Sequence, residues 1–96
     1  MSAARGEVVL ISAPFSSGSG KKVRPMVIVQ NDTDNARRRQ TILALISTNV
    51  NRASQPTHVL IDVSTADGQQ SGLHNNSVVS CNNLLTAPQS DIIRTI

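Results

Sequence analysis

Short apolar runs alternate with polar segments along this chain of 96 residues. The runs are rich in valine and isoleucine and are bounded by Gly, Pro, Asn, Asp and Ser, which is typical of β-strands. They are Val8–Ile11, Met26–Val29, Ile42–Ile46, Val59–Ile61, Val78–Val79 and Leu84–Leu85. No stretch keeps helical apolar spacing over the about 10 to 12 residues that a buried helix needs. The pattern therefore predicts a mainly β protein.

Three polar segments connect the predicted strands: residues 12–22, 31–40 and 63–76. Segment 31–40 carries residues suited to capping a helix, followed by an alanine and three arginines, and predicts a short helix. Its candidate N-caps are Asp32, Thr33 and Asp34. The other two segments are rich in small and polar residues, and we expect loops there. Without repeats or a linker, the chain predicts one domain over residues 1–96, built as a small antiparallel β-barrel.

Cysteine content and the lack of long apolar stretches narrow the class of protein. The one cysteine, Cys81, lies in an apolar run that begins at Val78, and we expect a small buried hydrophobic residue there and not a reactive thiol. No Cys and His residues stand at the spacing of a metal site, so we expect no metal. We find no signal peptide and no apolar run near the ~20 residues that span a bilayer. These features predict a cytoplasmic protein without membrane contact.

Positive charge is concentrated in one third of the chain. The net charge is +3, but residues 21–52 hold seven basic side chains against two acidic ones. This distribution suits a polyanionic partner, and a solvated basic surface is the competing interpretation. Phe15 is the only aromatic residue, whereas proteins that bind single strands without sequence preference usually carry several stacking rings. Binding to RNA would therefore rest mainly on charge and hydrogen bonds.

A cation and a hydroxyl stand at the ends of two predicted strands. Arg24 precedes Pro25 and one apolar run, and Ser47 and Thr48 follow the next. A guanidinium is always charged and presents a planar fork suited to phosphate oxygens, and a hydroxyl can donate or accept a hydrogen bond. These groups form a minimal set for handling a phosphodiester. Upstream, the glycine-rich segment before Lys21 and Lys22 can cradle phosphate through its amides, but it lacks the spacing of a nucleotide-hydrolysing loop.

His58 and His74 are the only side chains of a type that titrates near neutral pH. Two histidines can supply the acid and the base of a ribonuclease. However, nothing in the sequence places His74 beside His58. We therefore favour a structural role for both.

Five segments, taken in order, resemble strands of the MazF/PemK toxins, the RNA-cleaving halves of bacterial toxin–antitoxin pairs. They are Arg5–Leu10, Val23–Asp32, Ile42–Asn49, Pro56–Asp62 and Ser77–Val79. The resemblance implies an SH3-like barrel of the CcdB/PemK type with one or two short helices. Members of that family continue into a C-terminal helix, which we expect to be absent here because the sequence stops at Ile96.

The resemblance implies a type II toxin that cuts single-stranded RNA such as mRNA at a short motif, without a metal or another cofactor. The expected products carry a 2′,3′-cyclic phosphate and a 5′-hydroxyl. A homodimer, controlled by the C-terminal segment of a MazE/PemI-like antitoxin, is implied as well. A non-enzymatic gyrase poison of the related CcdB type is the alternative. The pair of Arg24 and Ser47 favours the enzyme.

The same resemblance assigns residues to the site. Arg24 and Ser47 correspond to the catalytic arginine and hydroxyl, with Thr48 left open as the acting hydroxyl. The general base stays unassigned. Asn82 and Asn83 stand where family members often carry Glu-Gln, and amides can read base edges. The expected RNA-binding residues are Phe15, Ser19, Lys21, Lys22, Thr48, Asn49, His58, Asn82 and Asn83.

Overall fold

The computed structural model describes residues 3–14, 20–52 and 54–96. Within them the strands are β1 Val8–Pro14, β2 Lys21–Ile28, β3 Gln40–Ser47, β4 His58–Ile61, β5 Ser77–Pro88 and β6 Ile92–Thr95. The α-helices are α1 Asp32–Arg37 and α2 Ala66–Gln70. Two 3₁₀ helices complete the described elements, η1 Val50–Arg52 and η2 Gln89–Asp91.

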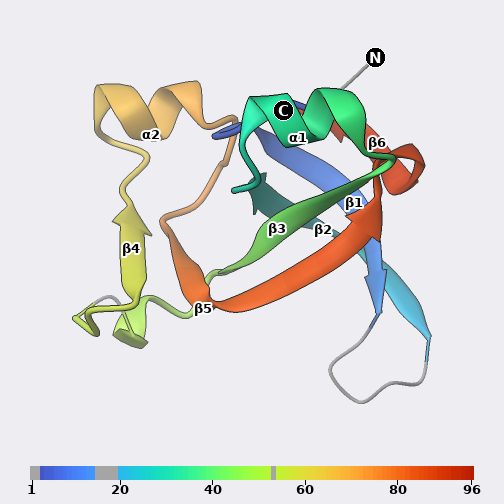
Figure 1. Cartoon of the computed structure of the whole chain (residues 1–96). Helices are drawn as coiled ribbons and strands as arrows, with labels where there is room; N and C mark the ends of the chain where they lie inside the picture. The colour runs from blue at the N-terminus through green and yellow to red at the C-terminus, as the bar shows by residue number, and fades with distance from the viewer. Residues whose placement is uncertain (1–2, 15–19, 53) are drawn as a thin grey trace.

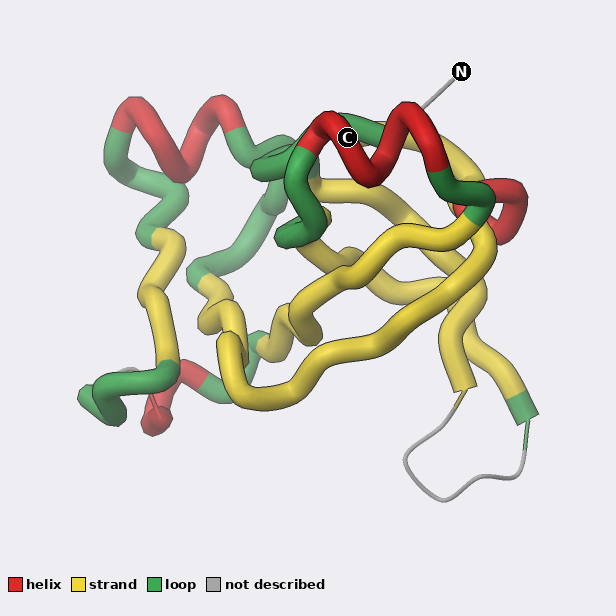
Figure 2. Tube along the Cα trace, viewed as in Figure 1, coloured by secondary structure: helices red, strands yellow, loops and turns green. Residues whose placement is uncertain are grey.

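All paired strands are antiparallel and form one curved sheet in the order β4-β5-β3-β2-β1-β6. Figures 1 and 2 show β3 and β5 on the near side of the molecule and β1 and β2 behind them. The predicted mainly β fold is confirmed. Among the described residues the edge strands β4 and β6 are not paired with each other, so the sheet wraps around the core without closing.

Strand β5 joins two apolar runs that the sequence pattern keeps apart, because it continues through the polar residues between them. Its register with β3 shifts between Ala44, which faces Leu84, and Leu45, which faces Ser80. The residues between those partners therefore bulge out of the ladder. Cys81 is one of them and is exposed, so the expectation that it is buried is wrong. The first half of β5 also pairs with β4.

The core lies inside the curve of the sheet and follows the alternation of the strands. One cluster is formed by Val9, Ile11, Ala13, Met26, Ile28, Leu43 and Ala87, and a second by Val8, Ala44, Ile46 and Val79. Strand β3 contributes to both clusters, since it runs through the middle of the sheet. Its far end carries Ser47, which is therefore held by a strand that is buried over most of its length.

Helix α1 forms where the sequence predicts a helix, but its cap is Asn31 and not Asp32, Thr33 or Asp34. The Asn31 side chain accepts a hydrogen bond from the backbone N–H of Asp34 at 2.8 Å. Asparagine caps as well as aspartate, and starting the helix one residue earlier places both acidic residues in its first turn, beside the positive end of its dipole.

Segment 63–76 was expected to be a loop throughout, and this is wrong because α2 lies within it. Thr65 caps the helix by accepting the N–H of Gly68 at 3.0 Å. Gly68 packs so closely on the backbone of Asp62 that any added Cβ would collide with it. The helix is short and lacks an apolar stripe, so the periodicity of the sequence cannot reveal it.

The last residues of the chain form β6, which pairs with β1. Within the described ranges, neither α-helix has the length and apolar character that crossing a membrane requires.

Candidate active site

Arg24 and Ser47 lie across from each other on neighbouring strands. Met26 of β2 pairs with Leu45 of β3. Extending this antiparallel register by two residues places Arg24 opposite Ser47, and because side chains alternate with a period of two, both lie on the same side of the sheet as that pair. Two segments that are distant in the sequence are thus brought together by strand pairing alone.

The guanidinium of Arg24 is only partly used by the protein. The residue is half-buried, and its Nε is fully buried without a hydrogen-bond partner among the described residues. An unsatisfied buried donor costs about 1–3 kcal/mol, so a protein rarely keeps one without a reason. Arg24 as a residue lines a cavity, and a guanidinium with a donor that these residues leave unused is suited to an anion that is bound from outside.

Ser47 has a defined orientation. Its Oγ accepts a hydrogen bond from the backbone N–H of Asn49 at 3.1 Å. This contact leaves the hydroxyl proton free to be donated. Thr48, the alternative hydroxyl, is exposed. The geometry therefore favours Ser47 as the ordered hydroxyl.

Both side chains line one cavity of about 380 Å³, here called the Arg24 cavity. It lies between β2, the end of β3 and the segment that precedes β5. Its charged, hydroxyl-bearing or imidazole lining residues include Lys22, Arg24, Ser47, Thr48, His74 and Ser77. Four residues predicted for the site, Lys22, Arg24, Ser47 and Thr48, are thus brought together.

His74 also lines the Arg24 cavity, and sequence reasoning left it out of the site. No spacing in the sequence connects it to Arg24 or Ser47, because it reaches them through the segment after β4. The one feature of the sequence that could have pointed to His74 was its residue type. Among the residues that line this cavity, it is the one of a type that exchanges protons near neutral pH.

Local hydrogen bonds shape the segment that carries His74. They begin at Asp62, whose pKa is lowered by hydrogen bonds from the hydroxyl and the backbone N–H of Ser64. After α2, Gly72 adopts a φ of +76° and packs against the backbone of Ile96. A side chain at this position would be strained and would also collide, so glycine is required for the turn that leads into Leu73 and His74.

The remaining predicted site residues that the structure describes lie outside the lining of the Arg24 cavity. Lys21 is exposed at the start of β2, and Asn49 is exposed after β3. Asn82 and Asn83 are exposed in the bulge of β5. Phe15 and Ser19 lie outside the described residues.

His58 opens β4, is 8% exposed, and lies 3.0 Å from the Thr57 hydroxyl through its Nδ1. Its burial and this contact fit the structural role that we favoured for it. His58 and His74 do not line a common cavity among the cavities found in the described residues.

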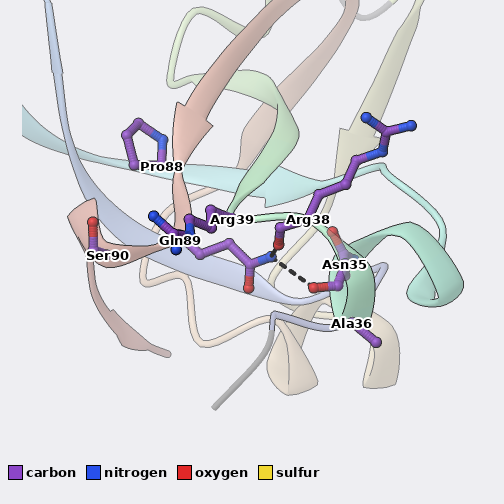
Figure 3. Close-up of a pocket in the computed structure, with 7 residues that line it drawn as sticks. All are labelled: Asn35, Ala36, Arg38, Arg39, Pro88, Gln89 and Ser90. Atoms are coloured by element: carbon purple, nitrogen blue, oxygen red, sulfur yellow. Dashed lines mark hydrogen bonds between the residues drawn. The ribbon is translucent and has the colours of Figure 1, made fainter.

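A second polar cavity of about 550 Å³, here called the Gln89 cavity, lies at α1 and η2 (Figure 3). Its lining includes Asn35, Arg38, Arg39 and Gln89. The Gln89 amide donates to the carbonyl oxygens of Asn35 and Arg38 at 2.8 and 2.9 Å. Among the described residues, no three His, Cys, Asp or Glu side chains gather in a way that could hold a metal ion.

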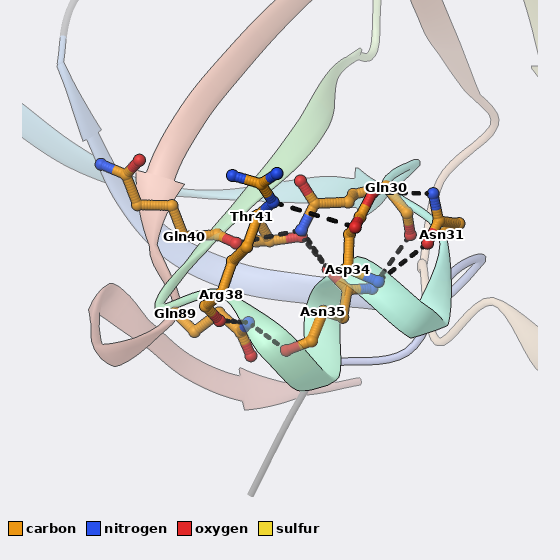
Figure 4. Close-up of polar contacts among 8 residues, drawn as sticks. All are labelled: Gln30, Asn31, Asp34, Asn35, Arg38, Gln40, Thr41 and Gln89. Carbon is orange, nitrogen blue, oxygen red and sulfur yellow. Dashed lines mark hydrogen bonds and ion pairs between the residues drawn. The ribbon is translucent and has the colours of Figure 1, made fainter.

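Asn35 is the centre of the polar network beside the Gln89 cavity (Figure 4). Its Oδ1 accepts from the Thr41 hydroxyl at 2.7 Å and from the Gln30 amide at 2.9 Å. Its Nδ2 donates to the Gln30 carbonyl at 2.9 Å. The side-chain oxygen and nitrogen of this buried asparagine are both paired.

Comparisons with known proteins agree with one another. Residues 4–96 match the model of a family described as a PemK-like, MazF-like toxin of type II toxin-antitoxin system. The endoribonuclease MazF of Staphylococcus epidermidis is 42% identical over 59 residues, which are 60% of this chain and 49% of the relative. That of Staphylococcus saprophyticus is 41% identical over 61 residues, 62% and 51% of the two chains. The chain spans about half the length of these curated relatives.

A solved structure, the Mycobacterium tuberculosis toxin MazF-mt6, is similar over most of the fold. The TM-score is 0.66 at 28% sequence identity, and the match covers 92% of this chain and 76% of that one. The overlap includes most of the sheet that positions the Arg24 cavity.

Proposed function

Because this chain belongs to the PemK-like, MazF-like toxin family of type II toxin–antitoxin systems, we propose that it is a sequence-specific endoribonuclease acting on single-stranded RNA such as mRNA. The observation that carries the proposal is the Arg24 cavity, where a buried guanidinium nitrogen without a hydrogen-bond partner among the described residues lies on the strand beside that of Ser47. The names of the relatives favour this activity over a gyrase poison of the CcdB type.

Cleavage of RNA without a metal uses the substrate's own 2′-hydroxyl as the nucleophile. The 2′-oxygen forms a bond to phosphorus, the bond to the 5′-oxygen breaks, and the products are a 2′,3′-cyclic phosphate and a 5′-hydroxyl. The site must stabilise the extra negative charge on the phosphate, accept the 2′-proton and supply a proton to the 5′-oxygen.

Arg24 is suited to the first of these tasks. Its Nε and a terminal nitrogen can give two parallel hydrogen bonds to two phosphate oxygens. Since Nε has no hydrogen-bond partner among the described residues, no such bond has to be broken when the guanidinium turns toward an oxyanion. A guanidinium does not release its proton in proteins, so Arg24 acts as a charge stabiliser and not as a base.

Ser47 is suited to orient the substrate. Because the N–H of Asn49 fixes its oxygen, the hydroxyl proton is available to a phosphate oxygen or to the 2′-oxygen. Lys22, on the wall of the same cavity, adds positive charge along the path of the backbone. Lys21 and Asn49 flank that path from the outside.

Partners follow from the same proposal. A homodimer is supported by large exposed apolar side chains on several strands, among them Val23, Val59, Leu60 and Leu84. Burying them against a second copy would add apolar contact to a small core.

The antitoxin is the second partner. Its acidic and apolar C-terminal segment would compete with RNA for the basic face around Lys21, Lys22 and Arg24.

The test is incubation of the purified chain with a long single-stranded RNA in the presence of EDTA. We expect fragments that a kinase labels at their 5′ ends without prior phosphatase treatment, and that carry a cyclic phosphate at the 3′ end. Intact RNA at micromolar protein, together with inhibited supercoiling by gyrase, would replace this proposal with the CcdB-type alternative.

A further inference from the structure

The two residues already assigned leave both proton transfers without a group to perform them, and the removal of the 2′-proton is the first of these. Arg24 holds its proton, and a serine hydroxyl is far too weak an acid or base to take up the 2′-proton at neutral pH. The Arg24 cavity must therefore contain another group if the reaction is to be fast. A lysine ammonium, as at Lys22, has three donors and no lone pair to offer.

His74 is the group that the fold supplies. It lines the Arg24 cavity together with Arg24 and Ser47, and among the described residues its imidazole has no hydrogen bond or ion pair to another part of the protein. A histidine that is committed to the structure has such a partner, as His58 has in Thr57. His74 is exposed, so its imidazole is open to a ligand.

The position of His74 also fits the course of a polynucleotide. A cavity of about 330 Å³ adjoins the Arg24 cavity and shares Pro25, Leu73 and His74 with it. Its wall adds Arg94 of β6. The backbone of an RNA strand that occupies both cavities passes His74 at their junction, with cationic side chains on either side.

The segment around His74 is held in place from both sides. The backbone N–H of Leu73 donates to Ser71 Oγ at 3.2 Å, and the hydroxyl of Ser77 donates to the carbonyl of Asn75 at 2.9 Å. The side chain of Asn76 accepts the backbone N–H of Val63 at 2.9 Å. The backbone that presents the imidazole is therefore ordered by contacts that do not involve the imidazole itself.

We propose that His74 is the general base of the cleavage reaction, an inference that rests on the proposed function. A neutral imidazole has one ring nitrogen with a free lone pair, and in this form the side chain can begin the reaction as a proton acceptor. It takes the 2′-hydroxyl proton while the 2′-oxygen bonds to phosphorus. The bond from phosphorus to the 5′-oxygen breaks, the leaving oxygen takes a proton from water, and the imidazolium then returns its proton to the solvent.

The test is single-turnover cleavage of an oligonucleotide with one ribonucleotide, placed at a site mapped beforehand on a long RNA. His74→Gln keeps hydrogen bonding but cannot take up the proton. We expect its rate at saturating protein to fall about 10²-fold or more, with unchanged half-saturation. For the wild type, the logarithm of the rate should rise with pH with a slope of about one and then level. The rising part of this profile, the pH limb, should be lost in the variant.

The pH limb reports on His74 only if no other group beside it changes its charge in the same pH range. The charged side chains that line the two cavities are Lys22, Arg24 and Arg94, and among the described residues no Asp or Glu side chain lines either cavity. Lysine and arginine side chains titrate far above neutral pH. Gln70→Ala, in the exposed part of α2 and outside both cavities, is the matched control and keeps the wild-type profile.

A second substrate separates a base from an acid. When the 5′-oxygen is replaced by a bridging sulfur, the leaving group departs without being protonated. His74→Gln remains slow on this substrate if the histidine is a base, whereas recovery of the wild-type rate overturns the assignment. Added imidazole partly restores His74→Ala.

Wild-type protein and Arg24→Ala are measured in parallel. Failure of the proposed function can then be told apart from failure of the role assigned to His74. A wild-type protein that leaves the RNA intact overturns the proposed function and this inference with it. A wild-type protein that cleaves, with His74→Gln equally fast and equally dependent on pH, overturns the role of His74 alone.

Discussion

The Arg24 cavity and the Gln89 cavity are both lined by arginines and amides, yet they use their polar groups in opposite ways. Around the Gln89 cavity, side-chain donors and acceptors are paired within the protein: Asn35, Thr41 and Gln89 hold one another and the backbone. In the Arg24 cavity the buried Nε of Arg24 has no partner among the described residues. A satisfied network stabilises the fold, whereas an unsatisfied one is maintained for a ligand.

This comparison makes opposite predictions for the two regions. Substitutions in the Arg24 cavity should lower activity and leave stability intact. Substitutions beside the Gln89 cavity should lower stability and leave the activity of the folded protein intact. The variants below are ordered by the size of the expected effect.

The largest effect is expected from Arg24→Ala, which should lower the single-turnover rate about 10³-fold, because it removes the donor that meets the developing charge. Arg24→Lys should recover little, since an ammonium cannot reproduce the two-pronged contact. The melting temperature should not fall in Arg24→Met, which keeps an unbranched apolar stem and removes an unpaired buried nitrogen. A markedly lower melting temperature in that variant would mean that Arg24 is structural.

Ser47→Ala is expected to lower the rate about 10²-fold, because the oriented hydroxyl is one neutral donor beside a charged one. Ser47→Thr should retain most activity, since it keeps the hydroxyl that the Asn49 N–H fixes. Thr48→Ala is the matched neighbour, and its effect should be smaller because Thr48 is exposed. If Thr48→Ala proves the more damaging of the two alanine variants, the acting hydroxyl is Thr48.

Asn35→Ala addresses the other side of the comparison. It leaves the fully buried Thr41 hydroxyl and the Gln30 amide without their shared acceptor, at a cost of about 2 kcal/mol. For a domain of this size the melting temperature should fall by roughly 8 to 16 °C. Cleavage measured well below that temperature should match the wild type.

A control for Asn35 is available on the same helix. Asn31→Ala removes the exposed cap of α1 and should cost about 1 kcal/mol, less than the buried residue. Loss of activity in a folded Asn35→Ala protein would show that the two cavities are coupled, and the separation drawn here would be wrong.

How far the sequence anticipates this structure differs from residue to residue. Short runs rich in Val and Ile and bounded by Gly, Pro, Asn, Asp and Ser predict the strands, because such runs are too short for a buried helix. Arg24 and Ser47 could be selected because each stands at the end of such a run. Their mutual position depends on the register of β2 with β3, which the resemblance implies and the chain itself does not display.

Other features depend on contacts that no local pattern records. Helix α2 is built from capping by Thr65 and close packing of Gly68, and neither leaves an apolar periodicity. His74 reaches the Arg24 cavity because Gly72 turns the chain against the last residue of the sequence, Ile96. A contact between positions so far apart cannot be derived from the residues around His74.

The smallest effect is expected from Arg38→Ala, the counterpart of Arg24 in the Gln89 cavity. Arg38 is 67% exposed on its side chain and lies 3.8 Å from Asp34, one helical turn away. Exposed pairs of this kind contribute at most about 0.5 kcal/mol, so the melting temperature should hardly change.

The measurement that distinguishes a solvated helix face from a surface that binds RNA is the salt dependence of RNA binding. Losing one phosphate contact lowers the slope of log affinity against log salt by about 0.7 for a single strand. Lys22→Ala should show this reduction, since Lys22 lines the Arg24 cavity. Arg38→Ala should keep the wild-type slope, because the RNA path proposed here does not reach α1. An equal reduction in both variants would extend that path across the helix and would make the run Arg37 to Arg39 part of the binding surface.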